Sequence, residues 1–496
     1  MNMKKLIKLT FVTAGLLFVY SCGEDFLVKE PSQFITTSQI ADAASKNPDV
    51  IAGTMTGIYA LMFETGTGGT TGHDDFGQKA YDVFGDMLSG DMALSVSTYG
   101  WYRASITEFQ CTQDFTFLDN YQVWRYYYRI IRSANTVIDA LGGNDALPEL
   151  DENKYILGQA KAMRAHSYFY LTQYFQKTYD PAELILPIYD DLQDQNGPKV
   201  AASEIYALIE SDLLSAISLL DGFNRTAKVQ VNQDVAKGIL AYVYGAMGKN
   251  PEVKTLTAEV IGTGSYPILD QAEVLGGFND VNTPGWIWGV DITPDGGLDL
   301  ISWWGQIDYY SYSYAAYGDA KAIDADLYAA IPANDVRKGQ FYTGTSAYRQ
   351  LMPLNKFYDA QRVPAGASTT VVADYIYMRI EEMYLMHAEA AAKTSDEAGA
   401  RTALKAVLDK RVPSSAYVDA LSGQALLDEI YLQQRIELWG EGKTYLNLKR
   451  NKKSTKRGAN HLSFVGEVIQ YNDERLTFEI PEAEIQNNPF ISDQNN

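Results

Sequence analysis

The stretch SEIYALIESDLLSAISLL, residues 203–220, decides the fold class. Its apolar side chains recur at intervals of three and four residues, which places them on one face of a helix. Ser203 is a preferred residue at a helix amino terminus, so we expect the helix to begin there and to carry Asp212 on its outer face. The apolar stripe consists of Ile205, Leu208, Ile209, Leu213, Ala216, Ile217 and Leu220.

The same spacing recurs on both sides of this stretch. A second stripe runs from Ile239 to Met247 and stops at Gly248, a residue that favours the left-handed conformation at a helix end. Several predicted helices form antiparallel pairs with short breaks, as tetratricopeptide-like units do when they stack into a curved wall. No clean self-repeat is visible, so the predicted fold is mostly α and similar to such repeats. Further helices are predicted over 48–62, 119–141, 153–176, 377–393, 396–411 and 422–439.

Two segments between the helical parts differ from them in composition. Residues 64–115 and 262–370 are rich in Gly, Thr, Asp and aromatic residues and carry little helical period. Irregular loops on a rigid scaffold are where binding sites usually lie. We therefore expect one domain over 22–496, in which loop-rich insertions with short strands carry the ligand site. Its parts are a helical part at 22–260, a loop-rich part at 261–370 and a helical part with the closing segment at 371–496, and short strands are predicted at 286–292 and 476–480.

The amino terminus indicates export. Three lysines precede an apolar run from Leu9 to Tyr20, and small residues flank Cys22. This pattern is typical of a secretory signal, and the run is shorter than the roughly 20 residues that a membrane-spanning helix needs. We expect cleavage after residue 21. Val19-Tyr20-Ser21-Cys22 resembles the lipobox of bacterial lipoproteins, which predicts a lipid on Cys22, and acids at Glu24 and Asp25 resemble a surface-export signal.

Charge and cysteine content exclude several classes of protein. The 62 acidic residues exceed the 41 basic ones, for a formal charge of -21, so nucleic acid and anionic lipid surfaces would repel the chain. With Cys22 lipidated, Cys111 has no partner for a disulfide or a thiolate metal cluster, and it is interpreted as a small buried hydrophobe. The basic stretch 449–457 is interpreted as a solvated loop rather than an anion site.

No motif for catalysis, metal or cofactor binding stands out. His73, His166, His387 and His461 lie far apart in sequence and none begins a His-Glu-x-x-His run. The glycine-rich segment 66–72 lacks the Gly-Lys-Ser/Thr ending of a phosphate-binding loop, so it is interpreted as a flexible loop. Paired carboxylates for glycoside hydrolysis stay open, because a chain with this many acids contains many candidate pairs. The sequence predicts no catalytic residue, no metal and no cofactor.

The chain is rich in aromatic residues, with 35 tyrosines and seven tryptophans, and these residues are the best guide to a ligand site. Two groups of them fall in the non-helical segments. Exposed rings offer flat apolar faces with polar tips, and the C–H face of a sugar stacks on such faces. Each of these rings is equally consistent with core packing. The two groups are Tyr99, Trp101 and Tyr102, and then Trp303, Trp304, Tyr309, Tyr310, Tyr312, Tyr314 and Tyr317, with Asp74, Asp75 and Lys79 as possible polar partners.

A series of short motifs, in order along the chain, resembles the SusD/RagB family of Bacteroidetes outer-membrane lipoproteins. Two positions depart from the family pattern: Gln434 stands where Glu is usual, and Thr444 where Arg is common, which puts local salt bridges in doubt. The motifs are Phe26-Leu27, Trp124 with Tyr128-Arg129-Ile130-Ile131, Ala160 to Ala165 with Pro187, Gly285-Trp286-Ile287-Trp288, Asp335 with Arg337, Tyr384 to Ala390, Glu437 to Gly442, and Ile480-Pro481 with Asn488-Pro489.

The resemblance implies a cell-surface receptor without a catalytic centre. It would capture an oligosaccharide or polysaccharide and act as a lid on a SusC-like TonB-dependent outer-membrane barrel. The membrane would be contacted through the lipid anchor only, on the extracellular side of the outer membrane. A binder of peptides or another nutrient is the alternative, and a surface glycoside hydrolase is a third. By order along the chain, we expect the ligand site to contain Trp101, Trp303 and Trp304, with Tyr99, Tyr309, Tyr310 and Asp74.

Overall fold

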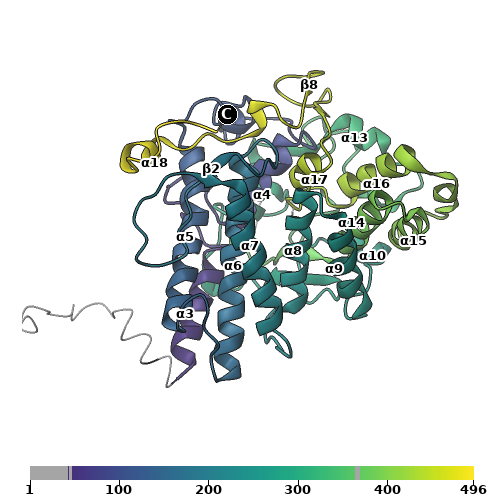
Figure 1. The fold of residues 1–496 in the computed structure, drawn as a ribbon. Coiled ribbons are helices and arrows are strands. Elements are labelled where there is room, and N and C mark those ends of the chain that lie inside the picture. The colour runs from purple at the N-terminus through teal and green to yellow at the C-terminus, as the bar shows by residue number, and fades with distance from the viewer. Residues whose placement is uncertain (1–42, 44–46, 364–368, 496) are drawn as a thin grey trace, which may run out of the picture.

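The computed structural model describes residues 43, 47–363 and 369–495. Long helices lie side by side and form a wall, in which each helix packs on the next (Figure 1). This arrangement confirms the mostly α prediction. The helices of the wall are α5 (Leu118–Ala140), α6 (Asp151–Phe175), α7 (Ala202–Leu219), α8 (Gln233–Met247), α9 (Asn250–Gly262), α14 (Ile380–Lys393), α15 (Glu397–Leu408) and α16 (Gly423–Glu437), with α3 (Asp49–Ala60) against α5 and α6.

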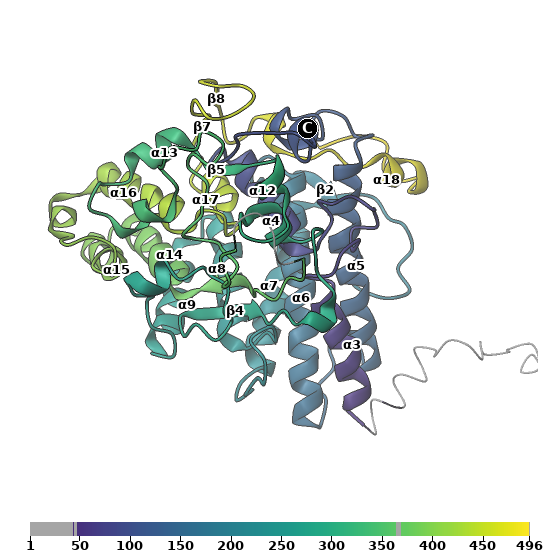
Figure 2. The same ribbon diagram turned by 180° about the vertical axis from the view of Figure 1, so that it is seen from behind.

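The described residues form four small antiparallel sheets of two strands each, and two of these sheets join segments that are distant in sequence. The pairing of Met92 with Ile323 brings the segment after α4 beside the loop-rich part of the chain. Seen from behind the wall, these loops and short helices cover it (Figure 2). The strand pairs are β1 (Met92–Leu94) with β5 (Lys321–Ile323), β2 (Leu184–Leu186) with β3 (Val200–Ala201), β4 (Trp286–Val290) with β6 (Tyr375–Arg379), and β7 (Thr455–Lys456) with β8 (Val468–Ile469).

Short helices complete the fold. Among them, α4 lies within a segment that the sequence predicts to be irregular, and all its side chains are buried. These short helices are α4 (Gln78–Leu88), α10 (Gln271–Val274), α11 (Trp303–Ile307), α12 (Tyr314–Tyr317), α13 (Ala325–Ala330), α17 (Thr444–Arg450) and α18 (Glu482–Asn487), with a π-helical turn at Arg103–Thr107 and 3-10 turns at Pro294–Gly296, Val336–Gln340, Ala416–Ala420 and Glu474–Leu476.

Several predicted details are wrong at the element ends. Helix α7 begins at Ala202 rather than at Ser203. Asp212 is buried instead of exposed, because the Arg164 guanidinium donates to its carboxylate at 2.7 and 2.8 Å. The helix predicted from residue 377 starts at Ile380 because β6 occupies the preceding residues, and no strand forms over 476–480. The prediction for Gly248 is confirmed: its φ of 76° is left-handed, and its N–H closes α8.

A buried charge network joins the last helices to the loop-rich part of the chain. The carboxylate of Glu437 accepts hydrogen bonds from Arg337, Arg379 and Arg411 at 2.9, 2.7 and 2.7 Å. These cations hold the pKa of Glu437 well below its ordinary value although burial alone would raise it. Since all four side chains are fully buried, the network fixes the scaffold on which the loops lie.

The side chains at the two positions that depart from the family motifs both form hydrogen bonds to buried acidic residues. Gln434 donates from its amide to Glu389 at 2.7 Å, and Glu389 also pairs with Arg450 at 2.8 Å. Thr444 donates from its hydroxyl to Asp86 at 2.7 Å. Neutral hydrogen-bonding groups therefore stand where the family commonly has charges.

Candidate functional site

Four aromatic side chains meet beside the β1–β5 pair, and we call His73, Tyr99, Trp101 and Tyr314 the aromatic cluster. The His73 ring stacks on Trp101 with centroids 5.1 Å apart and an interplanar angle of 5°. The Tyr314 ring meets His73, Tyr99 and Trp101 edge-on, at 5.8, 5.3 and 5.9 Å. The predicted residues Tyr99 and Trp101 thus lie together, joined by two residues from other segments.

The backbone of the cluster is held from its other side. The Asp319 carboxylate accepts hydrogen bonds from the N–H groups of Thr98, Tyr99 and Trp101 at 2.7, 3.0 and 3.3 Å. Tyr102 has a left-handed φ of 64°, a conformation that costs a tyrosine about 1 to 2 kcal/mol. The chain thus turns between the partly exposed Trp101 and the buried Tyr102 ring. The hydrogen bonds from Asp319 and the left-handed conformation of Tyr102 therefore fix the loop that carries Tyr99 and Trp101.

His73 is positioned through a chain of polar groups from the core. Its Nδ1 lies 2.6 Å from the Tyr314 hydroxyl, and its carbonyl accepts a hydrogen bond from the Gln306 amide at 2.8 Å. Gln306 in turn accepts a hydrogen bond from Lys321 at 2.7 Å. Burial lowers the pKa of Lys321 to about 7. These contacts fix the imidazole against Trp101 without using any group that faces solvent.

The exposure of the cluster suits contact with a flat ligand. Tyr99 is 58% exposed, whereas Tyr314 is 8% exposed and supports the other rings from below. Tyr312 and Tyr317, which follow in the same segment, are 45% and 47% exposed and lie 5.5 Å apart. Rings of this kind offer apolar faces and hydroxyl groups that can donate or accept hydrogen bonds.

The prediction that Trp303 and Trp304 belong to this surface is wrong. Their side chains are 2% and 1% exposed. Ser302 caps the short helix α11, with its hydroxyl accepting from the Gly305 N–H at 3.0 Å, and this places Trp303 in the core. There the Trp303 ring meets Phe357 edge-on at 4.8 Å, the same centroid distance as to Trp304. Neither indole can stack on a ligand without unpacking.

The predicted residues Tyr309 and Tyr310 form a second aromatic group. Their rings lie 5.6 Å apart and are partly exposed. The guanidinium of Arg349 lies 5.4 Å from the Tyr309 ring, and that of Arg362 lies 5.1 Å from the Tyr310 ring. Tyr348 connects this group to α12 through a hydrogen bond from its hydroxyl to the Ala315 carbonyl at 2.7 Å.

The predicted polar partners are buried rather than exposed. Asp74 is 7% exposed, and burial together with the neighbouring Asp119 carboxyl group raises its pKa well above the ordinary value. Burial also raises the pKa of Asp119, to about 6. Asp75 accepts hydrogen bonds from the N–H groups of Gly68 and Thr70 at 2.8 and 3.0 Å, so it orders the glycine-rich segment that the sequence analysis interprets as flexible. Lys79 is fully buried and pairs with Asp82 at 3.2 Å.

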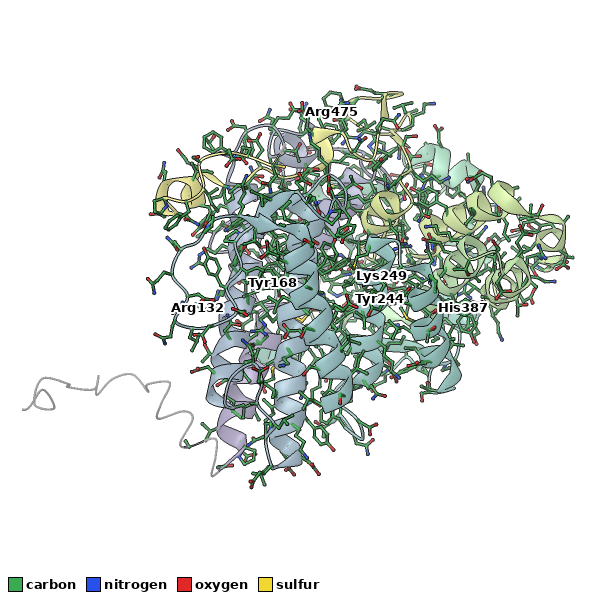
Figure 3. The ribbon with its side chains drawn as sticks, viewed as in Figure 1. Arg132, Tyr168, Tyr244, Lys249, His387 and Arg475 are labelled. Atoms are coloured by element: carbon green, nitrogen blue, oxygen red, sulfur yellow. The ribbon has the colours of Figure 1, made fainter. Side chains whose placement is uncertain are left out.

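Sequence reasoning missed part of the aromatic cluster. The sequence places Tyr314 in the aromatic excess but not in the predicted site, and it gives no signal that His73 lies beside Trp101. Asp319, which holds the loop, carries no sequence signal because its role depends on the β1–β5 pairing. His387 lies half-buried on α14, and its Nδ1 is 3.1 Å from the Thr257 hydroxyl (Figure 3).

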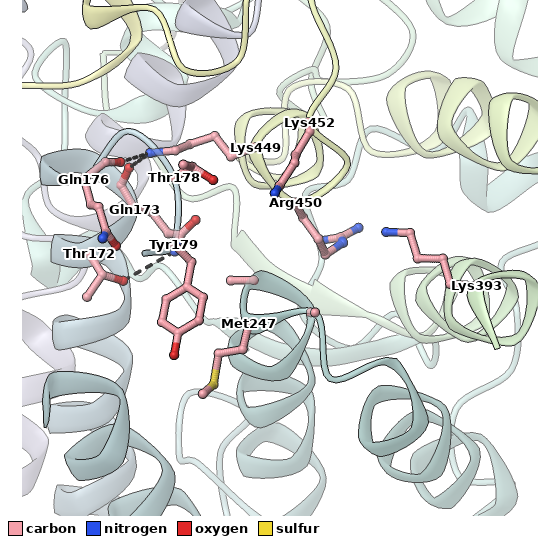
Figure 4. Close-up of a pocket in the computed structure, with 13 residues that line it drawn as sticks. Thr172, Gln173, Gln176, Thr178, Tyr179, Met247, Lys393, Lys449, Arg450 and Lys452 are labelled. Carbon is pink, nitrogen blue, oxygen red and sulfur yellow. Dashed lines mark hydrogen bonds between the residues drawn. The ribbon is translucent and has the colours of Figure 1, made fainter. Parts of the chain in front are cut away.

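A pocket of about 240 Å³ lies between α6, α8 and α17, with four cations around it (Figure 4). Most of these cations already have partners. Lys449 donates to the carbonyls of Gln173 and Gln176, and Arg450 and Lys393 both pair with Glu389. Burial lowers the pKa of Lys449 to about 7. Part of the basic stretch is therefore not the solvated loop that the sequence predicts: Lys449 is buried and supports the core, whereas Lys452 and Lys456 are exposed.

Other predictions concern metal sites, membranes and the anchor. Within the described residues, no group of three His, Cys, Asp or Glu side chains is arranged to hold a metal ion. No helix of the described ranges is long and apolar enough to cross a bilayer. Cys111 is a fully buried apolar side chain, as predicted, and burial raises its pKa. Cys22 and the signal segment lie outside the described residues.

Comparisons with known protein families and solved structures all find similarity to SusD-like proteins. The family model of the SusD family matches residues 338–496, and a model described as starch-binding associating with outer membrane matches residues 78–244. A SusD-like carbohydrate binding protein from Bacteroides vulgatus superposes with a TM-score of 0.75 at 23% identity, over 89% of this chain and 96% of that one. The helical wall is therefore the fold of SusD-like proteins.

Two further relatives agree with this placement. A surface glycan-binding protein A from Bacteroides thetaiotaomicron, in complex with laminarihexaose, has a TM-score of 0.67 at 15% identity and covers 90% of this chain and 99% of that one. A SusD-like protein from Formosa agariphila is 22% identical over 167 residues, which is 33% of this chain and 30% of that relative's length. This chain is therefore similar to SusD-like proteins over residues 78–244 and 338–496, and it has their fold.

Proposed function

We propose that this protein is a glycan-binding lipoprotein of the cell surface, and that the aromatic cluster is its ligand platform. The observation that carries the proposal is the set of four rings that is partly open to solvent and rigidly held by Asp319 and Gln306. Rigid aromatic side chains lose little entropy when a ligand stacks on them. The match to the SusD family model and the laminarihexaose complex of one structural neighbour support the same ligand class.

The proposed platform is smaller than the predicted set. It keeps Trp101 and Tyr99, adds His73 and Tyr314, and takes Tyr309 and Tyr310 as an adjoining group. Trp303, Trp304 and Asp74 support the platform from the core instead of contacting the ligand.

The proposal is capture without turnover. In glycoside hydrolases, two carboxyl groups usually face each other across the sugar at about 5 to 9 Å. Here the carboxyl groups near the cluster are buried: Asp319 accepts from three backbone N–H groups, and the pair Asp74 and Asp119 lie against each other. Such a pair has no room for a sugar between its members. Two of the similar solved structures, from Bacteroides vulgatus and Bacteroides thetaiotaomicron, are named for binding carbohydrate or glycan.

We further propose that lipid on Cys22 tethers the mature chain 22–496 to the outer membrane, facing outward, as a lid on a SusC-like TonB-dependent barrel. A tether raises the effective concentration of the lid at the barrel without a permanent contact. Cys22→Ala removes the sulfur that would carry the lipid, so the variant is expected in the soluble fraction. Recovery of the variant in the outer membrane of cells without the barrel would contradict the anchor.

The glycan assignment is tested by affinity electrophoresis and calorimetry of the purified chain. The panel contains neutral plant and host polysaccharides, laminarihexaose, and a peptide mixture as a separate arm. We expect at least one neutral glycan to bind and no new reducing ends to appear over hours. Binding of the peptides alone would replace the glycan assignment, and release of reducing ends would replace the proposal of capture without turnover.

A further inference from the structure

A groove of about 560 Å³ is lined by α5, residues 189–196 and α18, and none of its lining residues belongs to the aromatic cluster. Figure 1 shows α5 and α18 on the same side of the molecule. The α5 wall of the groove carries three arginines, and Figure 3 labels Arg132 on this side of the molecule. We call it the arginine groove. Its volume falls within the roughly 300 to 1,000 Å³ of small-ligand sites.

The three arginines are spaced to form one row. Arg125, Arg129 and Arg132 stand at positions i, i+4 and i+7 of α5, which spans about 10 Å along a helix. All three are exposed, and none forms an ion pair with any residue in the described ranges. In a chain of charge -21, three neighbouring arginines without a carboxylate partner are unusual, and they make a local positive wall.

The glycine-rich segment positions two of these guanidinium groups. Arg125 lies across Gly69, where an added Cβ would come within 2.5 Å of the arginine Nη1. Arg129 donates one long hydrogen bond, of 3.4 Å, to the carbonyl of Thr67. Asp75, which orders this segment, thereby also fixes the arginine wall. The remaining guanidinium donors have no partner among the described residues and face the groove or solvent.

Aromatic side chains form the base of the groove. Trp124 and Tyr128 meet at 4.9 Å, and Tyr128 meets Tyr189 at 5.6 Å. The Tyr128 hydroxyl donates to the carbonyl of Pro187 at 2.8 Å, which keeps the ring in place. Tyr121 and Tyr128 are partly exposed, so ring surface is accessible beside the cations.

The opposite wall has the other sign of charge. Asp194 accepts hydrogen bonds from the N–H groups of Asp190 and Asp191 at 2.8 and 3.0 Å, and Glu484 accepts from the Asn488 amide at 2.8 Å. These carboxylates are partly used in local turns, and they would repel an anion placed near them. An anionic ligand would therefore turn its charged groups toward α5 and its neutral face toward the rings.

We propose that the arginine groove is a second saccharide site, which takes a short oligosaccharide that carries carboxylate or sulfate groups. Both groups are planar or branched oxyanions that a guanidinium fork binds with two hydrogen bonds. The aromatic base accepts the apolar face of the same sugar. A neutral glycan would leave three guanidinium groups without anionic partners, so charge is what separates this site from the aromatic cluster.

The test is titration calorimetry at low salt with three probes of equal length: a trigalacturonate, a sulfated trisaccharide and a neutral trisaccharide. The variants are the triple change Arg125→Gln, Arg129→Gln and Arg132→Gln, the single change Trp101→Ala, and a charge-matched control, Lys410→Gln with Lys452→Gln and Lys456→Gln, at exposed positions elsewhere. We expect one or both charged probes to bind, the arginine variant to lose at least tenfold in affinity, and the other two variants to keep it. The neutral probe should bind the groove at least tenfold more weakly.

Each contrary outcome removes the proposal. If neither charged probe binds, or if the arginine variant and the lysine control lose affinity equally, the groove is no anionic saccharide site. If Trp101→Ala abolishes binding of the charged probes while the arginine variant keeps it, the aromatic cluster binds them instead. A polyglutamate peptide that binds through the arginines when neither sugar does would identify a protein partner in place of a saccharide. Loss of the neutral-glycan function at Trp101 leaves this proposal untouched, because the two sites share no side chain.

Discussion

The substitution Trp303→Ala tests whether Trp303 is a core residue or part of the ligand platform. A buried Trp removes about 150 to 250 Å² from water. At about 25 cal/mol per Å² this corresponds to about 4 to 6 kcal/mol, an upper value because unfolded chains already bury some surface. Measured Trp→Ala changes in cores cost about 3 to 5 kcal/mol. With Trp303 only 2% exposed and packed on Phe357 and Tyr375, we expect a loss in that range.

The assay is urea unfolding, in which the midpoint should fall while the slope stays the same. Tyr312→Ala is the matched control, since that ring is 45% exposed and its loss should change stability by less than about 0.5 kcal/mol. Glycan affinity of folded Trp303→Ala, measured well below its unfolding midpoint, should stay within a few fold of wild type. An unchanged midpoint together with lost affinity would mean that Trp303 contacts the ligand and is not a core residue.

Three further changes test the scaffold and the support of the cluster. Glu437→Gln leaves three buried arginines without their shared carboxylate, so we expect a loss of about 3 to 5 kcal/mol in urea unfolding, and a loss under 1 kcal/mol would show that the network is dispensable. Asp119 has its pKa raised to about 6, so the folded state holds this proton more tightly than the unfolded state and its contribution to stability falls as pH rises from about 4 to above 6. Asp119→Asn should therefore gain stability relative to wild type between pH 4 and pH 8, and an equal pH dependence of the two proteins would contradict the burial of the Asp119 carboxyl group. Tyr314→Phe removes the hydroxyl that contacts His73 at 2.6 Å. We expect glycan affinity to fall several fold with little change in melting temperature. Unchanged affinity would show that this contact with His73 does not contribute to ligand binding.

The long helices could be predicted because their apolar period is local. The stripe at 205–220 and the stop at Gly248 need no knowledge of the partner helix. The end of β6 and the start of α14 could not be placed, because Tyr375–Arg379 becomes a strand only through pairing with β4. Helix α4 is hard to predict for a related reason: its polar residues Gln78, Asp82 and Asp86 recur at helical spacing, but they are buried by contacts with segments that are distant in sequence.

The site was harder to predict than the scaffold. Trp101 and Trp303 look alike in sequence, since both lie in loop-rich segments beside other aromatic residues. Their difference comes from Asp319, which holds the Trp101 loop at the surface, and from the Ser302 cap, which places α11 in the core. Both contacts depend on chain segments that meet only in the folded state. The arginine row on α5 could have been read from its spacing, but its lack of carboxylate partners could not.

Trp101→Ala, titrated with a neutral glycan that binds the wild-type chain, tests the aromatic platform most directly. Stacking on an aromatic ring contributes about 1 to 3 kcal/mol for nucleic-acid bases, and a similar or smaller gain for a sugar predicts a loss of about tenfold. Tyr417→Ala, an exposed tyrosine in the carboxyl-terminal part, is the control and should bind as wild type does. A tenfold or greater loss in Trp101→Ala at an unchanged melting temperature is the predicted result. Equal affinities of wild type, Trp101→Ala and Tyr417→Ala would contradict glycan binding at this cluster.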